Sequence, residues 1–116
     1  MTKQARAIGR LAALAVAGML AASGAAAGDL AAGQKKAVKC RVCHGLDGIA
    51  RVPNAPNIGG ESEFYLKKQL EAFRSGERQD LQMTTIAKGL SDADIDDLAE
   101  YYAAIKVTHE IPDIPK

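Results

Sequence analysis

The stretch Lys39–Gly48, KCRVCHGLDG, has two cysteines three positions apart and a histidine directly after the second. The chain of 116 residues contains only two cysteines and two histidines, and three of these four residues lie within Cys40–His44. Such a concentration of sulfur and imidazole groups indicates one chemical site. That site could be a redox-active dithiol, part of a zinc centre, or the attachment point of a larger group.

Three simple interpretations of the two cysteines leave part of the motif unexplained. A thioredoxin-like dithiol stands between a strand and a helix, but no strand pattern precedes Cys40. A tetrahedral zinc site needs four ligands; adjacent Cys43 and His44 are awkwardly placed to share one metal, and only the distant His109 remains. A disulfide between cysteines so close in sequence would close too small a loop to stabilise the fold much.

Covalent haem attachment uses all three residues of the motif. The sulfurs of Cys40 and Cys43 would add across the two vinyl groups of the porphyrin, and His44 would bind the iron as its proximal ligand. Met83 is the only methionine after the N-terminal segment, and it is the predicted second axial ligand. A lone methionine could also be core filler, and the only spare histidine, His109, lies beyond the last predicted helix.

Residues 1–27 have the pattern of a secretory signal peptide that is cleaved from the mature protein. Three basic residues precede the apolar run LAALAVAGMLAA (11–22), and small residues then lead to an A-x-A cleavage pattern that ends at Ala27. The alternative is an uncleaved membrane anchor. This run is shorter than the roughly 20 strongly apolar residues of a membrane span, and it is mostly alanine. We therefore expect export to the periplasm.

Cleavage after Ala27 would leave 89 residues with twelve basic and fourteen acidic side chains, a net charge of −2. This charge lacks the basic excess that nucleic acid binding requires. The basic residues nevertheless gather around the cysteine motif, and acidic residues crowd the segment 92–100. Most such charges solvate a surface, but a basic surround could steer an acidic partner protein. The basic residues are Lys35, Lys36, Lys39, Arg41 and Arg51.

The sequence predicts an all-α domain over residues 28–106, because three segments show helical periodicity and none alternates as a strand. The first helix would begin after the N-cap Asp29 and run to the cysteines, with Leu30, Gly33 and Ala37 on one face. The second would span roughly 63–75. The last would begin at Ser91 with a capping box and bury a stripe of apolar residues: Ile95, Leu98, Ala99, Tyr102 and Ile105.

The remaining segments of the mature chain are predicted to be irregular. Turn residues are dense in 45–60, and 77–89 is also expected to lack a helix, so that Met83 would lie in a loop. The tail 107–116 contains two prolines and is expected to lie extended over the surface. A domain of this size with few aromatic residues has a marginal apolar core, so another group is expected to supply buried surface.

Four segments in order resemble the small class I c-type cytochromes, and most closely the cytochrome c4 and cytochrome c553-like branch. They are CRVCHGLDG (40–48), PNIGG (56–60), YLKKQLEAFRSGER (65–78) and MTTIAKGLSDADIDDLAEYY (83–102). The resemblance implies a cytochrome c fold around one covalent haem c, with Cys40 and Cys43 as anchors and His44 and Met83 as iron ligands. Cytochromes of the c4 type carry two such domains, whereas this chain has one attachment motif.

The resemblance also implies two supporting roles. The Pro56 carbonyl would accept the second ring N–H of His44 and orient the imidazole, although Pro56 could be a simple turn proline. Gly33 would let the first helix cross the last one closely, near Leu98 and Tyr101. The sequence departs from the family at Glu61, where members often carry glutamine, and at Ala37, where some carry an aromatic residue.

These residues predict a function in electron transfer. With both axial positions filled, the iron would have little room for substrate chemistry, so we expect a one-electron carrier and not an enzyme, with no catalytic residues and no small-molecule substrate. Its redox partner proteins would bind briefly and be guided by charge. One alternative is a haem c subunit stably bound to a periplasmic oxidoreductase such as a flavoprotein dehydrogenase. Another is a gas- or peroxide-binding haem protein.

Overall fold

The computed structural model of the chain describes residues 27–115, and its regular elements in that range are all helical. The order is α1 (Leu30–Lys36), the 3-10 turn η1 (Ala37–Lys39), α2 (Arg41–His44), α3 (Glu63–Ser75), α4 (Leu81–Lys88) and α5 (Asp92–Ala103). The predicted all-α class is confirmed for these residues. Within them, no helix is both long and apolar enough to span a membrane. The predicted signal peptide lies, except for Ala27, outside the described residues.

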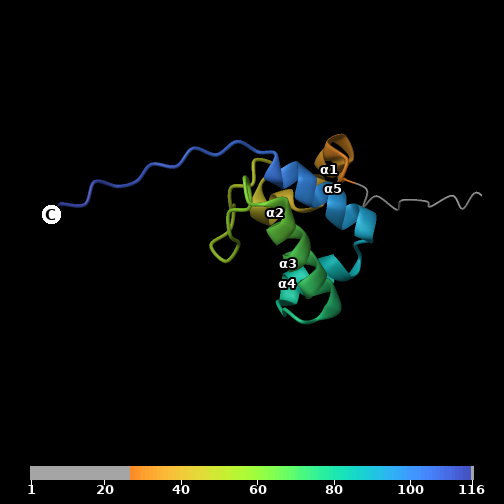
Figure 1. Cartoon of the computed structure of the whole chain (residues 1–116). Helices are drawn as coiled ribbons and strands as arrows, with labels where there is room; N and C mark the ends of the chain where they lie inside the picture. The colour runs from red at the N-terminus through yellow and green to blue at the C-terminus, as the bar shows by residue number, and fades with distance from the viewer. Residues whose placement is uncertain (1–26, 116) are drawn as a thin grey trace, which may run out of the picture.

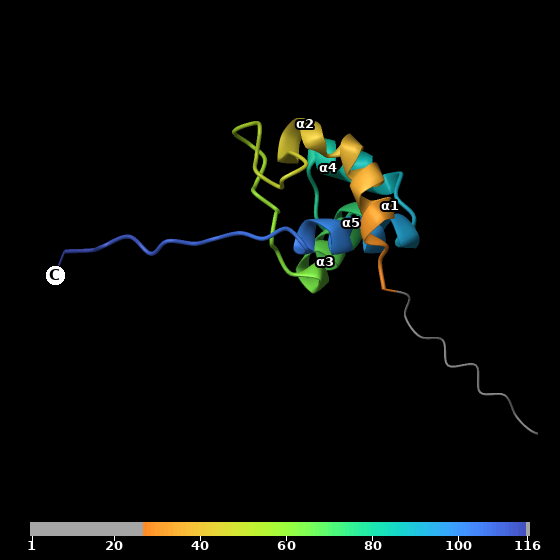
Figure 2. The same cartoon turned by 90° about the horizontal axis from the view of Figure 1, so that it is seen from above.

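Helices α1 and α5 lie side by side and cross closely (Figures 1 and 2). Gly33 is the point of closest approach, because a Cβ atom at this position would collide with the Asp97 carbonyl oxygen and lie 2.7 Å from Tyr101 Cβ. The close crossing that the resemblance implies is confirmed, with Asp97 as the backbone neighbour in place of Leu98. The Asp97 side chain also accepts the Asp29 backbone N–H at 2.7 Å, which fixes the start of α1 on α5.

Two partly buried ion pairs connect Lys36, at the end of α1, to the first half of α5. Lys36 Nζ lies 2.8 Å from Asp94 Oδ1 and 2.5 Å from Asp97 Oδ2. Asp94 is also the third residue of a capping box, in which its carboxylate accepts the Ser91 N–H and the Ser91 hydroxyl accepts the Asp94 N–H. The Lys36 ammonium and then these Ser91 contacts lower the pKa of Asp94 from its ordinary 3.8 to about 2.

The apolar core of the described residues is small. Ile95 is the only large side chain among them that is completely buried. The predicted stripe on the last helix is confirmed for four of its five members, while Ile105 lies just beyond the end of α5 and is half-buried. The buried apolar residues are Ala37, Leu66, Phe73, Ala87, Ile95, Leu98, Ala99 and Tyr102.

The prediction of an irregular segment at 77–89 was wrong, because this segment contains α4. The Asp80 carboxylate caps the helix by accepting the backbone N–H groups of Gln82 and Met83, each at 2.9 Å. Gly89 follows the last helical residue. The helix has only eight residues and includes Thr84 and Thr85, whose helix propensity is low. A helix this short gives almost no periodic signal in the sequence.

The predicted first helix is helical as far as the cysteine motif, but its last turn is not α-helical. The chain is α-helical to Lys36, tightens into the 3-10 turn η1, and then forms the separate short helix α2. A 3-10 turn makes i→i+3 hydrogen bonds and winds the chain more tightly than an α-helix does. The predicted inner face is correct for Gly33 and Ala37, but Leu30 is 50% exposed and lines a shallow groove with Tyr101 and Ile105.

Residues 106–115 form an extended segment after α5. In both views this segment leads away from the helical body and does not cover its surface (Figures 1 and 2). Its two isoleucines, Ile111 and Ile114, are 91% and 79% exposed. The tail therefore contributes little to the core.

Replacing Gly33 with alanine should destabilise the domain. The added Cβ has no space against the Asp97 carbonyl, so α1 and α5 must move apart, and overpacking of this kind costs about 1–3 kcal/mol. Denaturant unfolding of the haem-loaded protein measures this loss. Gly89→Ala is the matched control, because its Cβ would meet only Ile86 O at 3.5 Å. Equal stabilities of the two variants would refute the close crossing.

The free energy of unfolding should fall when the pH drops from about 4 to 2. The folded-state pKa of Asp94, about 2, lies below its ordinary value of 3.8. The stabilisation by Lys36 is therefore complete above the unfolded pKa and is lost as the pH falls through the folded one. Lys36→Gln should be less stable at neutral pH and lose less stability over this interval than the exposed-site control Lys35→Gln. Identical acid profiles for the two variants would contradict the ion pair's role.

Candidate functional site

Helix α2 carries the cysteine–histidine motif. Cys40 is the residue before its first turn, and Cys43 and His44 form its end. The His44 N–H donates to the Cys40 carbonyl at 2.9 Å, so one helical turn presents all three side chains to the same cavity. Both cysteines are free thiols, and burial raises the pKa of Cys40. The thiol pair is therefore available for covalent attachment of another group.

The imidazole of His44 is buried and held in one orientation. Its Nδ1 lies 2.9 Å from the Pro56 carbonyl oxygen. A carbonyl can only accept a hydrogen bond, so Nδ1 must carry the proton and donate it. In the neutral ring, Nε2 then keeps its lone pair for a metal. Pro56 belongs to the irregular loop that follows α2, as the sequence predicts for 45–60.

Two tyrosines on α5 hold the chain directly after His44. The Tyr102 hydroxyl donates to the Gly45 carbonyl at 2.9 Å, and the Tyr101 hydroxyl donates to the Leu46 carbonyl at 2.8 Å. The Tyr102 hydroxyl is buried, and burial raises its pKa. The sequence indicated Tyr102 as a core residue but gave no signal for either hydroxyl contact, because both carbonyls lie more than 50 residues away in the chain. These bonds fix the position of α2 on α5.

Met83 reaches the same cavity from α4. It is half-buried, and its backbone N–H is fixed by the Asp80 cap. The cavity thus has among its lining residues Cys40, Cys43, His44, Pro56 and Met83, which come from three separate segments. His109, by contrast, lies in the exposed C-terminal segment and does not line the cavity.

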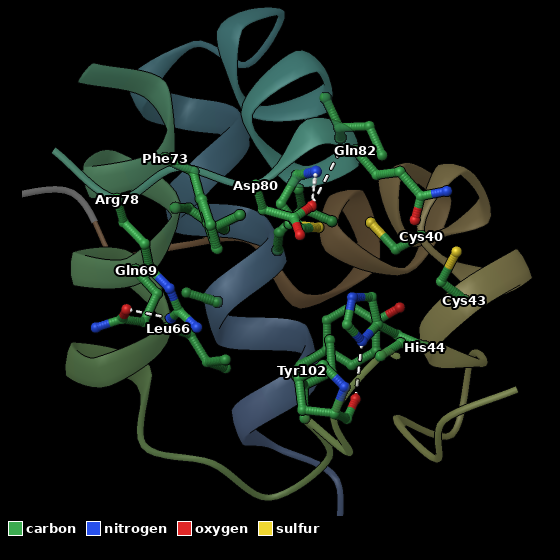
Figure 3. A pocket seen from close by; sticks show the side chains of 18 of the residues that line it. Cys40, Cys43, His44, Leu66, Gln69, Phe73, Arg78, Asp80, Gln82 and Tyr102 are labelled. Atoms are coloured by element: carbon green, nitrogen blue, oxygen red, sulfur yellow. Dashed lines mark hydrogen bonds between the residues drawn. The ribbon is translucent and has the colours of Figure 1, made fainter. Parts of the chain in front are cut away.

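The cavity has a volume of about 350 Å³ and mostly apolar walls. Figure 3 shows Cys40 and Cys43 at one end of it, with Arg78 and Gln69 at the opposite end. The apolar wall residues come from the loop and from α3, α4 and α5: Ile58, Leu66, Leu70, Phe73, Ile86, Leu98 and Ala99. Walls of this kind suit a large, flat apolar ligand.

The donor set fits haem better than it fits a bare metal ion. In the part of the chain that the structure describes, no three His, Cys, Asp or Glu side chains cluster as metal ligands would. Two thiols, one imidazole nitrogen with a free lone pair, and one thioether line an apolar cavity. Thiols can bond to vinyl groups, and imidazole and thioether are axial ligands of haem iron.

The sequence model of the family described as "Cytochrome c" matches residues 30–105. The chain belongs to the cytochrome c family. Family membership, together with the two cysteines of the motif, implies one covalently bound haem c, and the residues around the cavity fit this group.

Relatives and a solved structure agree with this assignment to cytochrome c. The chain is 47% identical over 83 residues to cytochrome c4 of Pseudomonas aeruginosa, covering 72% of this chain and 41% of that protein. It is 46% identical over 81 residues to cytochrome c-554(548) of Halomonas halodenitrificans, covering 67% of this chain and 98% of that protein. The crystal structure of reduced recombinant cytochrome c4 from Pseudomonas stutzeri matches with a TM-score of 0.64 and 40% identity, covering 69% of this chain and 47% of that chain.

The alignments differ in how much of each cytochrome c they include. This chain spans less than half the length of the two cytochrome c4 proteins and nearly the whole of cytochrome c-554(548). The likeness to the c4 and c553-like branch, inferred from four sequence segments, is confirmed by these matches. The matched region extends over all the helices described above.

Proposed function

We propose that this cytochrome c is a one-electron carrier whose haem is bonded to Cys40 and Cys43 and whose iron is ligated by His44 and Met83. The observation that carries the proposal is that His44 and Met83 line one cavity from two different helices, α2 and α4. In the neutral ring, donation from Nδ1 to the Pro56 carbonyl leaves the lone pair of His44 Nε2 free for the iron. The bound haem supplies a single ferric–ferrous couple at this place.

The residues around the proposed ligands would tune this couple. A methionine and a histidine together raise the reduction potential relative to two histidines, because the soft thioether favours ferrous iron. The Pro56 carbonyl makes the imidazole a more basic ligand and fixes its direction. The apolar walls from α3, α4 and α5 keep water from the site, so few solvent dipoles must reorient when an electron arrives.

The surface beside the motif suits brief contact with an acidic redox partner. Lys36 and Arg51 are paired with carboxylates. Within residues 27–115, Lys35, Lys39 and Arg41 have no carboxylate within ion-pair distance. Their charges remain available to attract a partner toward the side of the domain that carries the cysteines. Small interfaces guided by charge permit the fast dissociation that a mobile carrier needs.

Export to the periplasm is part of the proposal. It is supported by the basic start, the apolar run and the A-x-A pattern of residues 1–27. A covalent tether suits an exported protein, because the haem cannot then diffuse away from its carrier. The cytochrome would shuttle electrons between protein partners in that compartment.

Replacing Met83 with alanine should open the sixth position of the iron. The oxidised protein should lose the weak absorption band at the red end of the visible spectrum that marks methionine–iron bonding. It should bind added imidazole and show a lower reduction potential, because water or imidazole favours ferrous iron less than a thioether does. Visible spectroscopy and a redox titration measure these changes.

The matched control for this experiment is Thr85→Ala, which lies on the same helix but does not line the cavity. It should keep the band and the potential of the unaltered protein. A Met83→Ala protein that retains the band and excludes imidazole would refute methionine ligation.

A further inference from the structure

A shallow groove lies between α1 and the end of α5, and we call it the α1–α5 groove. Its walls are mostly apolar, with one aromatic ring and one side-chain amide. Among the described residues, none lines both this groove and the cavity beside His44. The groove residues are Leu30, Ala31, Gln34, Tyr101, Ala104 and Ile105. Apolar grooves with an aromatic wall bind extended, proline-containing segments.

The C-terminal segment 107–115 has a repeat of three residues. Ile111 and Ile114 each precede a proline, and both isoleucines are exposed. A polyproline II helix has three residues per turn, so in this conformation the two isoleucines lie on one edge of the segment. A proline also keeps the residue before it extended. Because Pro112 and Pro115 lack an N–H, the segment suits a groove that binds side chains better than the edge of a β-sheet.

The start of this segment is fixed to the domain. Val107 lies against Gly60, where an added Cβ atom would be 2.8 Å from Val107 Cγ2. The Gly60 N–H donates to the Tyr102 carbonyl at 2.9 Å, which holds this contact on α5. From there the segment leads away from the helices (Figures 1 and 2), and none of its described residues lines the α1–α5 groove. Its isoleucines are therefore presented to another molecule.

The groove and the segment are close enough together to serve one two-fold interface. Ile105 lines the groove, and the segment begins two residues later at Val107. An isologous dimer uses the same surface patch on both subunits, so a patch that holds both the groove and the segment can complement itself. The nine residues of the segment would span about 28 Å as polyproline II, whereas the seven residues of α1 are about 10 Å long. The segment is thus long enough to cross the groove of a second copy.

The segment would have to reverse direction to enter its own groove. Residues 106–110, KVTHE, contain neither the glycine nor the proline that tight turns favour. A second copy of the chain needs no such reversal, because its groove can meet the segment as it leaves the domain.

The charges of the segment and of the groove's surroundings are opposite. Glu110 and Asp113 lie on either side of Ile111, whereas Lys35 and Lys106 are each next in sequence to a groove residue. In residues 27–115, none of these four charged side chains has an opposite charge within ion-pair distance. Complementary charges of this kind select the partner and its orientation. They favour this acidic segment as the occupant of the groove.

We propose that two copies of this chain exchange their C-terminal segments, so that Ile111 and Ile114 of each copy pack in the α1–α5 groove of the other. The exchange makes the same contact twice in each dimer. It uses none of the residues that line the cavity beside His44, so it is separate from the proposed haem site. The proposal goes beyond electron transfer and does not depend on the identity of the iron ligands.

Sedimentation velocity of the haem-loaded protein over a wide range of concentration tests the association. The unaltered protein should form reversible dimers. Ile111→Ala and Ile114→Ala should each raise the dissociation constant of the dimer about tenfold, which is 1.4 kcal/mol. Phe64→Ala is the control, because it truncates a side chain that is 77% exposed but lies outside the segment and the groove. Monomers at every concentration, or equal effects of the three variants, would overturn the proposal.

A mixing experiment tests whether the segment binds the groove. Ala31→Glu should block the groove with a larger, acidic side chain at an exposed helical position, and this variant alone should be monomeric. The double variant Ile111→Ala/Ile114→Ala should also be monomeric. When the two variants are mixed, one intact segment can bind one intact groove, so native mass spectrometry with one variant labelled with nitrogen-15 should detect mixed dimers. A mixture that associates no more than either variant alone would refute the exchange.

Discussion

Few of the apolar side chains in the described residues are buried by the protein alone. Among the described residues, Ile95 alone is both large and completely buried, and the apolar residues of α3, α4 and α5 line a common cavity instead of packing only on one another. The apolar core of a domain of this size gives the folded state only a small margin of stability. Haem c supplies the missing buried surface, and because it is bound by the native state and not by the unfolded chain, it stabilises the fold. Cofactor and fold therefore depend on each other.

The two sides of the cavity are built differently. On the histidine side, the close crossing at Gly33, the Lys36 ion pairs and the hydroxyls of Tyr101 and Tyr102 fix α1 and α2 on α5. On the methionine side, α4 is a short helix whose start depends on the Asp80 carboxylate. The imidazole thus sits on a rigid support, whereas the thioether is carried by an element with fewer constraints. With the proposed ligation, this arrangement would hold His44 constant and leave Met83 as the ligand that small changes in packing alter.

The sequence predicted the main features of the site because they are local. Three residues close together in the sequence, Cys40, Cys43 and His44, identify the attachment motif. The long helices α3 and α5 can be predicted from their periodicity and from the N-caps Ser62 and Ser91. The short helix α4 was missed, although Asp80 before it and Gly89 after it were signals that could have shown it. The hydroxyl contacts of Tyr101 and Tyr102 could not be predicted. They depend on how distant segments are brought together, which the periodicity of a single helix does not encode.

The most direct test of the account is the intact mass of the protein purified from its native host, measured in denaturing solvent, beside the variant Cys40→Ala/Cys43→Ala. The unaltered chain should carry the mass of one haem that denaturation does not remove, and it should have no thiol that reacts with an alkylating reagent. The double variant should carry neither the added mass nor, by circular dichroism, most of the helix content. An unaltered protein that shows only the mass of its polypeptide, with two reactive thiols, would contradict the account.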